Sequence, residues 1–297
     1  MKLTFLGTGC MIPTKERNHS GIFLSYKTHG FLFDCGEGIQ RQFRIANIKP
    51  TKVDKIFISH WHGDHVFGLP GLLSTLSACA YERIVEIYGP KGTKNHMACL
   101  KNFFESKIAV QISVIEIDSG KCWEDENLFV EAFQLRHNVP SIGFRVVEKD
   151  RLRINVVKAK KFGVSEGPEM GKLQHGKDVV VDGKKVSYKD VTYVVSGIKI
   201  GYISDTSLCE NVFKIAEGAD LLICESTYDS SLEQKAEEYF HLTAFQAAMI
   251  ASKSGAKRLV LTHFSQRYKE IKQILDDAKQ AFDNVSCAHD FMSIKFS

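Results

Sequence analysis

The sequence predicts a layered α/β fold in which helices lie outside sheets, and three observations lead to this prediction. Short apolar runs typical of buried strands alternate with stretches of helical periodicity along the chain of 297 residues. The strands fall into two blocks, and helices follow each block. Four apolar runs end in side chains that can bind a metal, at His60, His137, Asp205 and His263. We therefore expect sheets inside, helices outside, and a site along the rim where the sheets meet.

The first block of strands consists of apolar and β-branched runs that end in glycine or polar clusters. Its expected strands are residues 2–6, 21–25, 30–33, 55–59 and 85–88. Helical periodicity in the same part of the chain predicts helices over residues 39–47, 70–80 and 93–106. The strand over 30–33 ends in the polar cluster 34–38, and the strand over 55–59 leads directly into His60.

The second block begins near Ala109. Its expected strands are residues 110–117, 128–135, 142–147, 193–195, 199–203, 220–224, 257–262 and 292–296. The strands over 193–195 and 199–203 are expected to form a hairpin around Ser196 and Gly197. Helices are predicted over residues 208–217, 243–254 and 271–282. Thr243 is a suitable N-cap for the second of these helices, and Gly255 ends it.

Residues 59–65 read Ser-His-Trp-His-Gly-Asp-His and contain four potential metal ligands, His60, His62, Asp64 and His65. Neutral imidazole nitrogens and carboxylate oxygens are preferred ligands of zinc and similar divalent ions. Gly63 allows the tight turn that lets both halves of the motif face inward. A closed structural zinc site usually uses cysteines, and none of the eight cysteines is paired at metal spacing. We therefore expect an open, catalytic metal site.

The set of candidate metal ligands has seven members: His60, His62, Asp64, His65, His137, Asp205 and His263. Seven side chains are too many for one tetrahedral ion, but they fit two ions that share a carboxylate. Asp205 is the best candidate for the shared ligand, because it lies in the middle of the set and has two oxygens. Two ions about 3.5–4 Å apart activate water near neutral pH and stabilise the attacking and leaving oxygens. Such a site suits hydrolysis of a phosphate diester or of a strained ester or amide.

The composition, with 44% hydrophobic and 25% charged residues, is that of a soluble globular protein. No apolar run reaches the roughly 18 residues of a membrane span, and no apolar leader follows Met1. The eight cysteines are scattered, which argues against a disulfide framework. We therefore expect a cytoplasmic protein that does not bind a membrane.

The ligand pattern resembles that of the metallo-β-lactamase fold, and within this fold the chain is most similar to ribonuclease Z, the tRNA 3′-processing endonuclease. The resemblance runs nearly from end to end. Its narrower motifs are the loop 13–18, the sequence Gly167-Pro168 and the segment 262–268 around the last ligand. Two positions depart from the family pattern, since Cys224 and Leu242 stand where the family has a histidine and a serine.

The resemblance implies one domain over residues 1–297, an αββα four-layer sandwich interrupted by a protruding arm. It also implies two zinc ions per subunit. One ion would be held by His60, His62, His137 and Asp205, and the other by Asp64, His65, Asp205 and His263. Asp64 would also accept a proton from the attacking water. His241, oriented by Glu225, would protonate the leaving 3′ oxygen, although an ordinary buried hydrogen-bonded pair is the alternative for these two residues.

Residues 151–190 interrupt the strand pattern between His137 and Asp205. This stretch has ten Lys and Arg against five Asp and Glu, so it carries +5, whereas the whole chain carries +4. Concentrated positive charge is typical of a segment that contacts phosphates. We expect a small helix and a hairpin on a stalk, forming a flexible arm that binds the folded tRNA backbone. The alternative is a solvated surface loop, although about 40 residues is long for one.

The family resemblance further implies contacts with precursor tRNA. The residues expected to make them are Lys15, Arg17, Asn18, Gly167, Pro168, Lys172 and Thr243. The family also implies a homodimer in which the arm of one subunit holds the tRNA that the other subunit cuts.

Three functions are compatible with these observations to different degrees. The leading hypothesis is a zinc-dependent endoribonuclease that removes the 3′ trailer of precursor tRNA after the discriminator base and leaves a 3′ hydroxyl. The alternative is a hydrolase of the same fold acting on a small ester, thioester or sulfate, which leaves the basic arm unexplained. The third is an RNA-binding protein without catalysis, which the complete set of seven ligands argues against.

Overall fold

The computed structural model describes residues 1–103, 105 and 108–296. The end of the helix predicted over 93–106 therefore lies outside the described residues. The chain forms two compact units. The larger unit comprises Met1–Trp123, Val130–Val146 and the chain from Lys199 onward, and the smaller unit comprises Glu124–Phe129 and Val147–Ile198.

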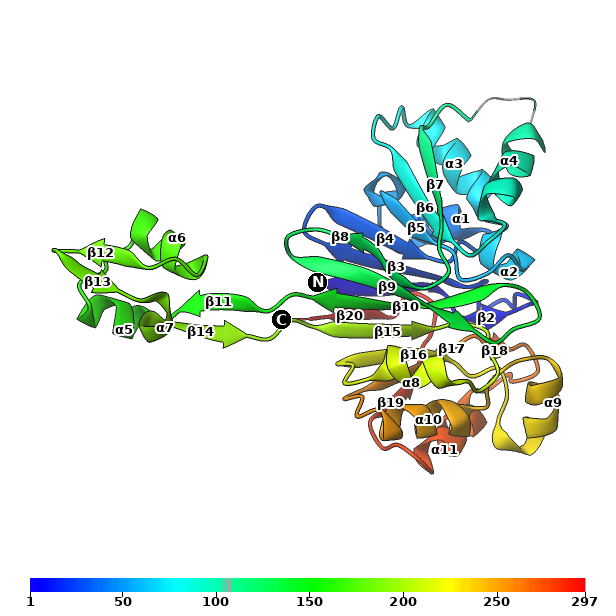
Figure 1. Cartoon of the computed structure of the whole chain (residues 1–297). Helices are drawn as coiled ribbons and strands as arrows, with labels where there is room; N and C mark the ends of the chain where they lie inside the picture. The colour runs from blue at the N-terminus through cyan, green and yellow to red at the C-terminus, as the bar shows by residue number, and fades with distance from the viewer. Residues whose placement is uncertain (104, 106–107, 297) are drawn as a thin grey trace. The chain divides into compact units, whose positions relative to one another are not determined.

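The first sheet has seven strands in the order β20-β1-β3-β4-β5-β6-β7. These strands are β1 (Lys2–Gly7), β3 (Gly21–Tyr26), β4 (His29–Phe33), β5 (Lys55–Phe57), β6 (Val85–Gly89), β7 (Ile112–Glu116) and β20 (Ser293–Lys295). Strands β20, β1, β3 and β4 are antiparallel, whereas β4 to β7 run parallel. The helices on its outer face are α1 (Ile39–Ile45), α3 (Leu69–Ala78) and α4 (Thr93–Phe103) (Figure 1).

The second sheet also has seven strands, in the order β19-β17-β16-β15-β10-β9-β8. These strands are β8 (Gly120–Glu124), β9 (Leu128–Leu135), β10 (Ser141–Glu148), β15 (Lys199–Ile203), β16 (Leu221–Glu225), β17 (Leu259–Thr262) and β19 (Val285–Cys287). Strands β15, β16, β17 and β19 run parallel. The helices packed on its outer face are α8 (Glu210–Ala216), α10 (Ala244–Lys253) and α11 (Lys272–Lys279).

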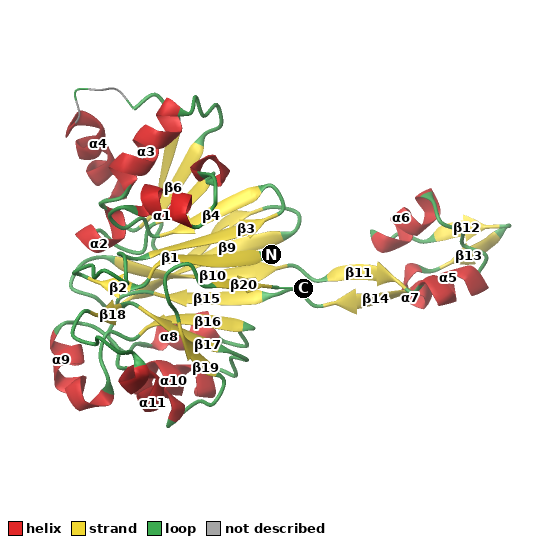
Figure 2. Cartoon of the chain, turned by 180° about the vertical axis from the view of Figure 1, so that it is seen from behind, coloured by secondary structure: helices red, strands yellow, loops and turns green. Residues whose placement is uncertain are grey.

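An aromatic core fills the space between the two sheets. The ring centroid of Phe144 in the second sheet lies 5.7 Å from that of Phe33 and 5.4 Å from that of Phe57, both in the first sheet. Rings packed in this way bury a large apolar area. Figure 2 shows the helices of the larger unit outside the two sheets. The predicted αββα four-layer sandwich is therefore confirmed.

Short elements complete the larger unit. They are β2 (Gly9–Cys10), η1 (Pro50–Lys52), α2 (Gly63–Val66), η2 (Ser230–Leu232), α9 (Glu233–Glu238) and β18 (Phe264–Ser265). Strands β2 and β18 form a separate parallel pair. Helix α10 begins as predicted, because the Thr243 hydroxyl accepts from the Gln246 amide and the Gln246 side chain accepts from the Thr243 amide. Among the described residues, no helix has the length and apolar character needed to cross a bilayer.

The hairpin expected around Ser196 and Gly197 is wrong. Strand β14 (Thr192–Val195) pairs instead with β11 (Arg151–Ile154), and β15 belongs to the second sheet. A Cβ atom at Gly197 would lie 1.8 Å from the Glu148 carbonyl oxygen. The glycine therefore permits the close approach of two chain segments, which its lack of a side chain allows, and does not form a hairpin turn between β14 and β15.

The smaller unit contains the basic stretch 151–190 and has an apolar core of its own. Beside the β11–β14 ribbon it has α5 (Val156–Lys161), α6 (Pro168–Gln174), β12 (Val179–Val181), β13 (Lys184–Val186) and α7 (Tyr188–Val191). Six buried residues form its core: Ala159, Val164, Leu173, Val179, Val186 and Val191. All ten Lys and Arg of the stretch are exposed. The predicted hairpin is present, three short helices stand where one was expected, and the positive charge faces solvent.

Candidate active site

The seven candidate ligands lie in loops and a short helix that follow strands of both sheets. They follow β5 (His60 and His62), lie on α2 (Asp64 and His65), or follow β9 (His137), β15 (Asp205) and β17 (His263). An apolar strand holds each loop firmly, and the loop itself is free to carry polar groups. The structure brings the seven side chains together in two clusters.

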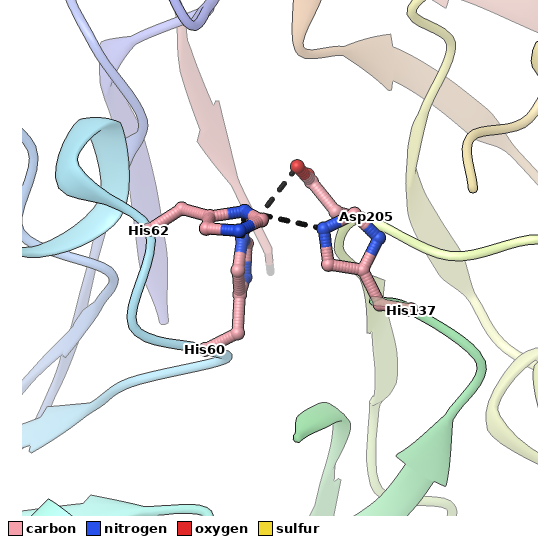
Figure 3. Close-up of side chains that lie close together, drawn as sticks. All are labelled: His60, His62, His137 and Asp205. Atoms are coloured by element: carbon pink, nitrogen blue, oxygen red, sulfur yellow. Dashed lines mark hydrogen bonds and ion pairs between the residues drawn. The ribbon is translucent and has the colours of Figure 1, made fainter. Parts of the chain in front are cut away.

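The first cluster consists of three histidines and one carboxylate. His60 Nε2 lies 3.1 Å from His62 Nδ1 and 3.6 Å from Asp205 Oδ2. His137 Nε2 lies 3.2 Å from the same His62 nitrogen. Figure 3 shows the four side chains converging from three loops, with His60 and His62 on the same one.

The second cluster shares Asp205 with the first. His65 Nε2 lies 3.2 Å from His263 Nε2 and 3.5 Å from Asp64 Oδ2. Asp205 Oδ1 lies 3.6 Å from His65 Nε2 and 3.3 Å from His263 Nδ1. Asp205 therefore offers one oxygen to each cluster, which is the arrangement a bridging ligand requires.

Both clusters have the spacing of a metal site. Two ligands bonded to one tetrahedral zinc ion lie about 3.3 Å apart, given bonds of about 2.0–2.1 Å. The distances in the clusters, from 3.1 Å to 3.6 Å, fall around this value. Among the described residues, Asp205 Oδ1 is a buried oxygen without a hydrogen-bond partner, and such atoms are rare unless a ligand satisfies them. The residues therefore fit divalent metal ions.

The histidines of the first cluster are in the form that binds metals. Burial lowers the pKa of His60, His62 and His137 below the ordinary value. Near pH 7 the three rings are neutral and offer nitrogen lone pairs, which a divalent ion requires.

The second cluster combines two ionised carboxylates with two histidines. Burial raises the pKa of Asp64 and Asp205, but the neighbouring histidines outweigh this effect and hold both pKa values below the usual range. Burial lowers the pKa of His65 and His263, but the carboxylates outweigh it and raise both pKa values. A bound ion would take the place of the protons on these two rings.

Asp34 orients His65, and the sequence analysis did not predict this role. His65 Nδ1 donates to Asp34 Oδ2 at 2.9 Å, which leaves His65 Nε2 facing the second cluster. Asp34 is fully buried and also accepts from the Ser59 amide and hydroxyl and from the Tyr202 hydroxyl. A sequence signal existed, because Asp34 directly follows the predicted strand 30–33.

Two other candidate ligands have hydrogen-bond partners that are harder to recognise in the sequence. His60 Nδ1 lies 3.0 Å from the Ser59 hydroxyl, and His137 Nδ1 lies 3.1 Å from the Phe240 carbonyl oxygen. A backbone carbonyl that holds a ligand has no signature in the sequence. Partners of this kind fix the ring orientation and the tautomer of the ligand.

His241 and Glu225 form a hydrogen-bonded pair beside the clusters. His241 Nδ1 lies 3.1 Å from Glu225 Oε1 and 3.9 Å from Asp205 Oδ2. Glu225 is fully buried and accepts from the amides of Thr206 and Leu242. Burial lowers the pKa of His241, but the charge and hydrogen bond of Glu225 outweigh this effect, so the pKa lies above the ordinary value. The pair is therefore suited to hold a proton next to the candidate metal ligands.

Comparison with known proteins gives the family. The protein "Ribonuclease Z" of Methanothermobacter thermautotrophicus is 40% identical over 296 residues, covering 99% of this chain and 96% of that protein. "Ribonuclease Z" of Geobacillus kaustophilus is 38% identical over 301 residues, covering 99% and 98%. The chain belongs to the ribonuclease Z family. The crystal structure of human tRNase Z, short form (ELAC1), matches with a TM-score of 0.73 and 33% identity over 99% of both chains.

Two further similarities concern the scaffold that the chain shares with other proteins. The family profile described as "Anti-Pycsar protein Apyc1" matches residues 1–154. The metallo-β-lactamase fold protein YhfI of Bacillus subtilis has a TM-score of 0.72 at 18% identity, covering 99% and 98% of the two chains, which is a similarity of fold alone. This member of the ribonuclease Z family is thus a metal-dependent enzyme with the metallo-β-lactamase fold.

A cavity of about 660 Å³ opens beside both clusters. Its polar lining includes His62, Asp64, His137, Asp205 and His241. Its apolar lining was missed in the sequence and includes exposed side chains, namely Met11, Ile12, Phe67 and Tyr239. These residues follow no pattern that separates them from ordinary surface positions.

The residues of the larger unit that were predicted to bind substrate lie in different environments. Lys15 is exposed. Arg17 is buried, and its Nη2 donates to the Tyr268 carbonyl at 2.7 Å, so this cation holds the loop in place. Asn18 Nδ2 donates to the Glu37 carbonyl at 2.8 Å. Thr243 is buried and caps α10.

The remaining predicted substrate residues lie in the smaller unit. Pro168 occupies the first turn of α6, Gly167 precedes it with φ of 154°, and Lys172 is exposed on the same helix. Proline in the first turn is favourable, because its missing N–H has no partner there in any case. This turn fixes the direction in which α6 presents its lysine.

Proposed function

We propose that this chain is an endoribonuclease that removes the 3′ trailer from precursor tRNA, cutting after the discriminator base and leaving a 3′ hydroxyl. One observation carries the proposal: seven candidate metal ligands and the Glu225–His241 pair lie around one cavity, in a chain that ribonuclease Z proteins match nearly from end to end. Hydrolysis of a phosphodiester needs an activated water and a proton donor for the leaving oxygen.

The two clusters support two zinc ions per subunit. One ion would be held by His60, His62, His137 and Asp205, and the other by Asp64, His65, Asp205 and His263. Imidazole nitrogens and carboxylate oxygens in this number are suitable zinc ligands. When bound, the ions would supply Lewis acidity toward the scissile phosphate and make water reactive near neutral pH.

Two side chains are proposed to move protons. Asp64 lines the cavity and presents a carboxylate there, so its position suits it to accept the proton of the attacking water. The Met11 amide donates to Asp64 Oδ2 at 2.8 Å and holds the carboxylate in place. His241 is proposed to give its proton to the leaving 3′ oxygen.

The first experiment incubates the zinc-loaded protein with a tRNA carrying a 3′ trailer and maps the new 3′ end. We expect a single cut after the discriminator base that a chelator abolishes. Asp64→Ala should stop the cut while precursor tRNA binding, measured by a gel shift, is retained. No cut by a preparation with two metal ions per chain would overturn the proposal and favour a small-ester hydrolase, and cleavage by Asp64→Ala would overturn the role of Asp64.

The basic stretch 151–190 is proposed to be a flexible arm that binds the tRNA backbone, with Gly167, Pro168 and Lys172 among its contacts. Its ten exposed cations surround a core of only six apolar residues, which supports a role in binding phosphates. Lys15, Arg17, Asn18 and Thr243 are proposed to act near the tRNA 3′ end, where Arg17 and Thr243 would do so by shaping their loops.

Removal of the arm should separate binding from chemistry. Ile154 and Thr192 are paired in the β11–β14 ribbon, so an Asn-Gly turn between them can replace residues 155–191. We expect KM for precursor tRNA to rise at least about tenfold and the salt dependence of binding to weaken, because phosphate contacts are lost. Hydrolysis of the small phosphodiester bis(p-nitrophenyl) phosphate should not change, because this substrate does not need the arm for binding.

A charge-matched pair of variants tests the same point without a deletion. Lys160→Gln with Lys184→Gln removes two exposed charges from the arm, and Lys253→Gln with Lys279→Gln removes two from the larger unit. Only the first pair should weaken precursor tRNA binding. Equal effects of the two pairs, or an unchanged KM after arm removal, would contradict a tRNA-binding arm.

A homodimer in the cytoplasm is proposed as the working state. Eight free cysteines support a reducing compartment. If the arm of one subunit serves the site of the other, mixing the arm-deleted chain with a ligand-deficient chain should restore cleavage. A monomer in analytical ultracentrifugation, or recovery of the protein in a secreted fraction, would overturn the corresponding part of this proposal.

A further inference from the structure

A cysteine lies beside the second metal cluster, and no step proposed above uses it. Cys10 Sγ, a carboxylate oxygen of Asp64 and a ring nitrogen of His263 lie within 4.8 Å of one another. Cys10 is 8% exposed and lines the cavity at the site. Among the described residues, it is the one cysteine that belongs to any cluster of potential metal ligands.

The backbone holds Cys10 in this position from both sides. Strand β2 pairs in parallel with β18, and the register places Cys10 opposite Ser265, two residues after His263. The amide of the next residue, Met11, donates to Asp64 Oδ2 at 2.8 Å. Cys10 is thus tied to the segments that carry both neighbouring ligands, so its thiol is positioned by secondary structure.

A second observation points to a ligand in the same space. Asp205 Oδ1 is buried without a hydrogen-bond partner among the described residues, and it lies 3.3 Å from His263 Nδ1. Thiolate is among the strongest ligands for zinc, with bonds of about 2.3 Å, and it favours soft ions over hard ones. The sulfur borders this space, because it lies within 4.8 Å of ligand atoms of Asp64 and His263.

We propose that the Cys10 thiolate is an additional ligand of the ion held by Asp64 and His263. The proposal deepens the metal site on which the proposed function rests. The thiol proton is released to solvent when the metal–sulfur bond forms. The second cluster then has sulfur, nitrogen and oxygen donors, whereas the first has nitrogen and oxygen alone. The sulfur biases the second site toward zinc, cobalt and cadmium and away from manganese and magnesium.

X-ray absorption at the zinc edge tests this without any variant. In the zinc-loaded wild-type protein we expect a sulfur scatterer at about 2.3 Å, in a proportion of one sulfur to two zinc ions. A spectrum with nitrogen and oxygen scatterers alone would overturn the proposal. The readout is independent of RNA cleavage, so a protein that binds zinc through sulfur but leaves precursor tRNA intact would disprove the proposed function and not the ligand.

Cobalt substitution identifies the sulfur. The cobalt-loaded wild type should have a thiolate-to-cobalt charge-transfer band in the near ultraviolet, and this band should be absent in Cys10→Ala and Cys10→Ser. Cys35→Ala is the matched control, since Cys35 is fully buried and its amide donates to the His65 carbonyl, but its thiol belongs to no cluster. We also expect Cys10→Ala to lower the zinc affinity of one site at least about tenfold. A band that survives in Cys10→Ser, or is lost in Cys35→Ala, would overturn the proposal.

Discussion

Replacement of Asp205 by asparagine should remove both metal ions together and abolish cleavage of precursor tRNA. Asp205 Oδ2 lies 3.6 Å from His60 in the first cluster, and Asp205 Oδ1 lies 3.3 Å from His263 in the second. The amide that replaces the carboxylate has one oxygen and no charge, so it cannot serve both sites. Metal content per chain, measured by mass spectrometry after dialysis, should fall from two ions toward zero.

The size of the effect follows from the place of Asp205 in the site. Loss of a residue that only orients a ligand typically costs about 10–100-fold in metal affinity or activity. Loss of a shared ligand should exceed that range. Asp34→Asn is the matched control, because Asp34 is a buried carboxylate that, among the described residues, hydrogen-bonds to His65 and to no other predicted ligand. An Asp205→Asn protein that keeps two ions, or an effect no larger than that of Asp34→Asn, would contradict a bridging role.

The candidate ligands were predictable because the sequence indicates them in two ways, by residue type and by position at the end of a predicted strand. Each of four ligands follows an apolar run that was predicted to be a strand. These ligands are His60, His137, Asp205 and His263. Strand ends in a sandwich lie at its rims, so residue type and position together indicated one site. The geometry of the two clusters then depends on packing between sheets, as the contact between Phe33 and Phe144 illustrates.

The expected hairpin at Ser196 and Gly197 is wrong because strand pairing depends on distant parts of the chain. Strand β14 pairs with β11, which lies about forty residues earlier in the chain, and a local turn signal at Ser196 and Gly197 does not report such a distant partner. Arg17 has the same character, because its contact with the Tyr268 carbonyl joins residues 251 positions apart. The family resemblance predicts a tRNA contact at Arg17, and this stays a prediction. What the sequence does not reveal is the tertiary contact by which Arg17 supports its loop.

Replacement of His241 by alanine should slow cleavage of precursor tRNA by about 10²–10⁴-fold without weakening its binding. A positioned general acid contributes an acceleration of this size. His241 lies 3.9 Å from Asp205 and donates to the buried Glu225, so its loss removes the proton donor and spares the metal ligands. Single-turnover cleavage and a binding assay on the same variant measure the two effects separately. His289→Ala, at an exposed histidine outside the site, should change neither.

The leaving group provides a sharper test of the same role. The 3′ oxygen of a nucleotide is a strongly basic leaving group and needs a proton, whereas p-nitrophenolate leaves readily without one. His241→Ala should therefore impair hydrolysis of bis(p-nitrophenyl) phosphate far less than cleavage of precursor tRNA. Equal losses on both substrates would indicate that the variant disturbs the metal site, and they would argue against a general acid.

The pH dependence distinguishes proton donation from a purely structural pairing. Burial lowers the pKa of His241, but Glu225 outweighs it, so the pKa is raised and the ring stays protonated to a higher pH. An acid must be protonated to act, so kcat should be full below this pKa and fall as the pH rises through it. Glu225→Gln removes the carboxylate charge, which should shift the falling limb to lower pH, and His241→Ala should remove the limb. If the pair were structural only, both variants would lower thermal stability and leave the pH profile in place.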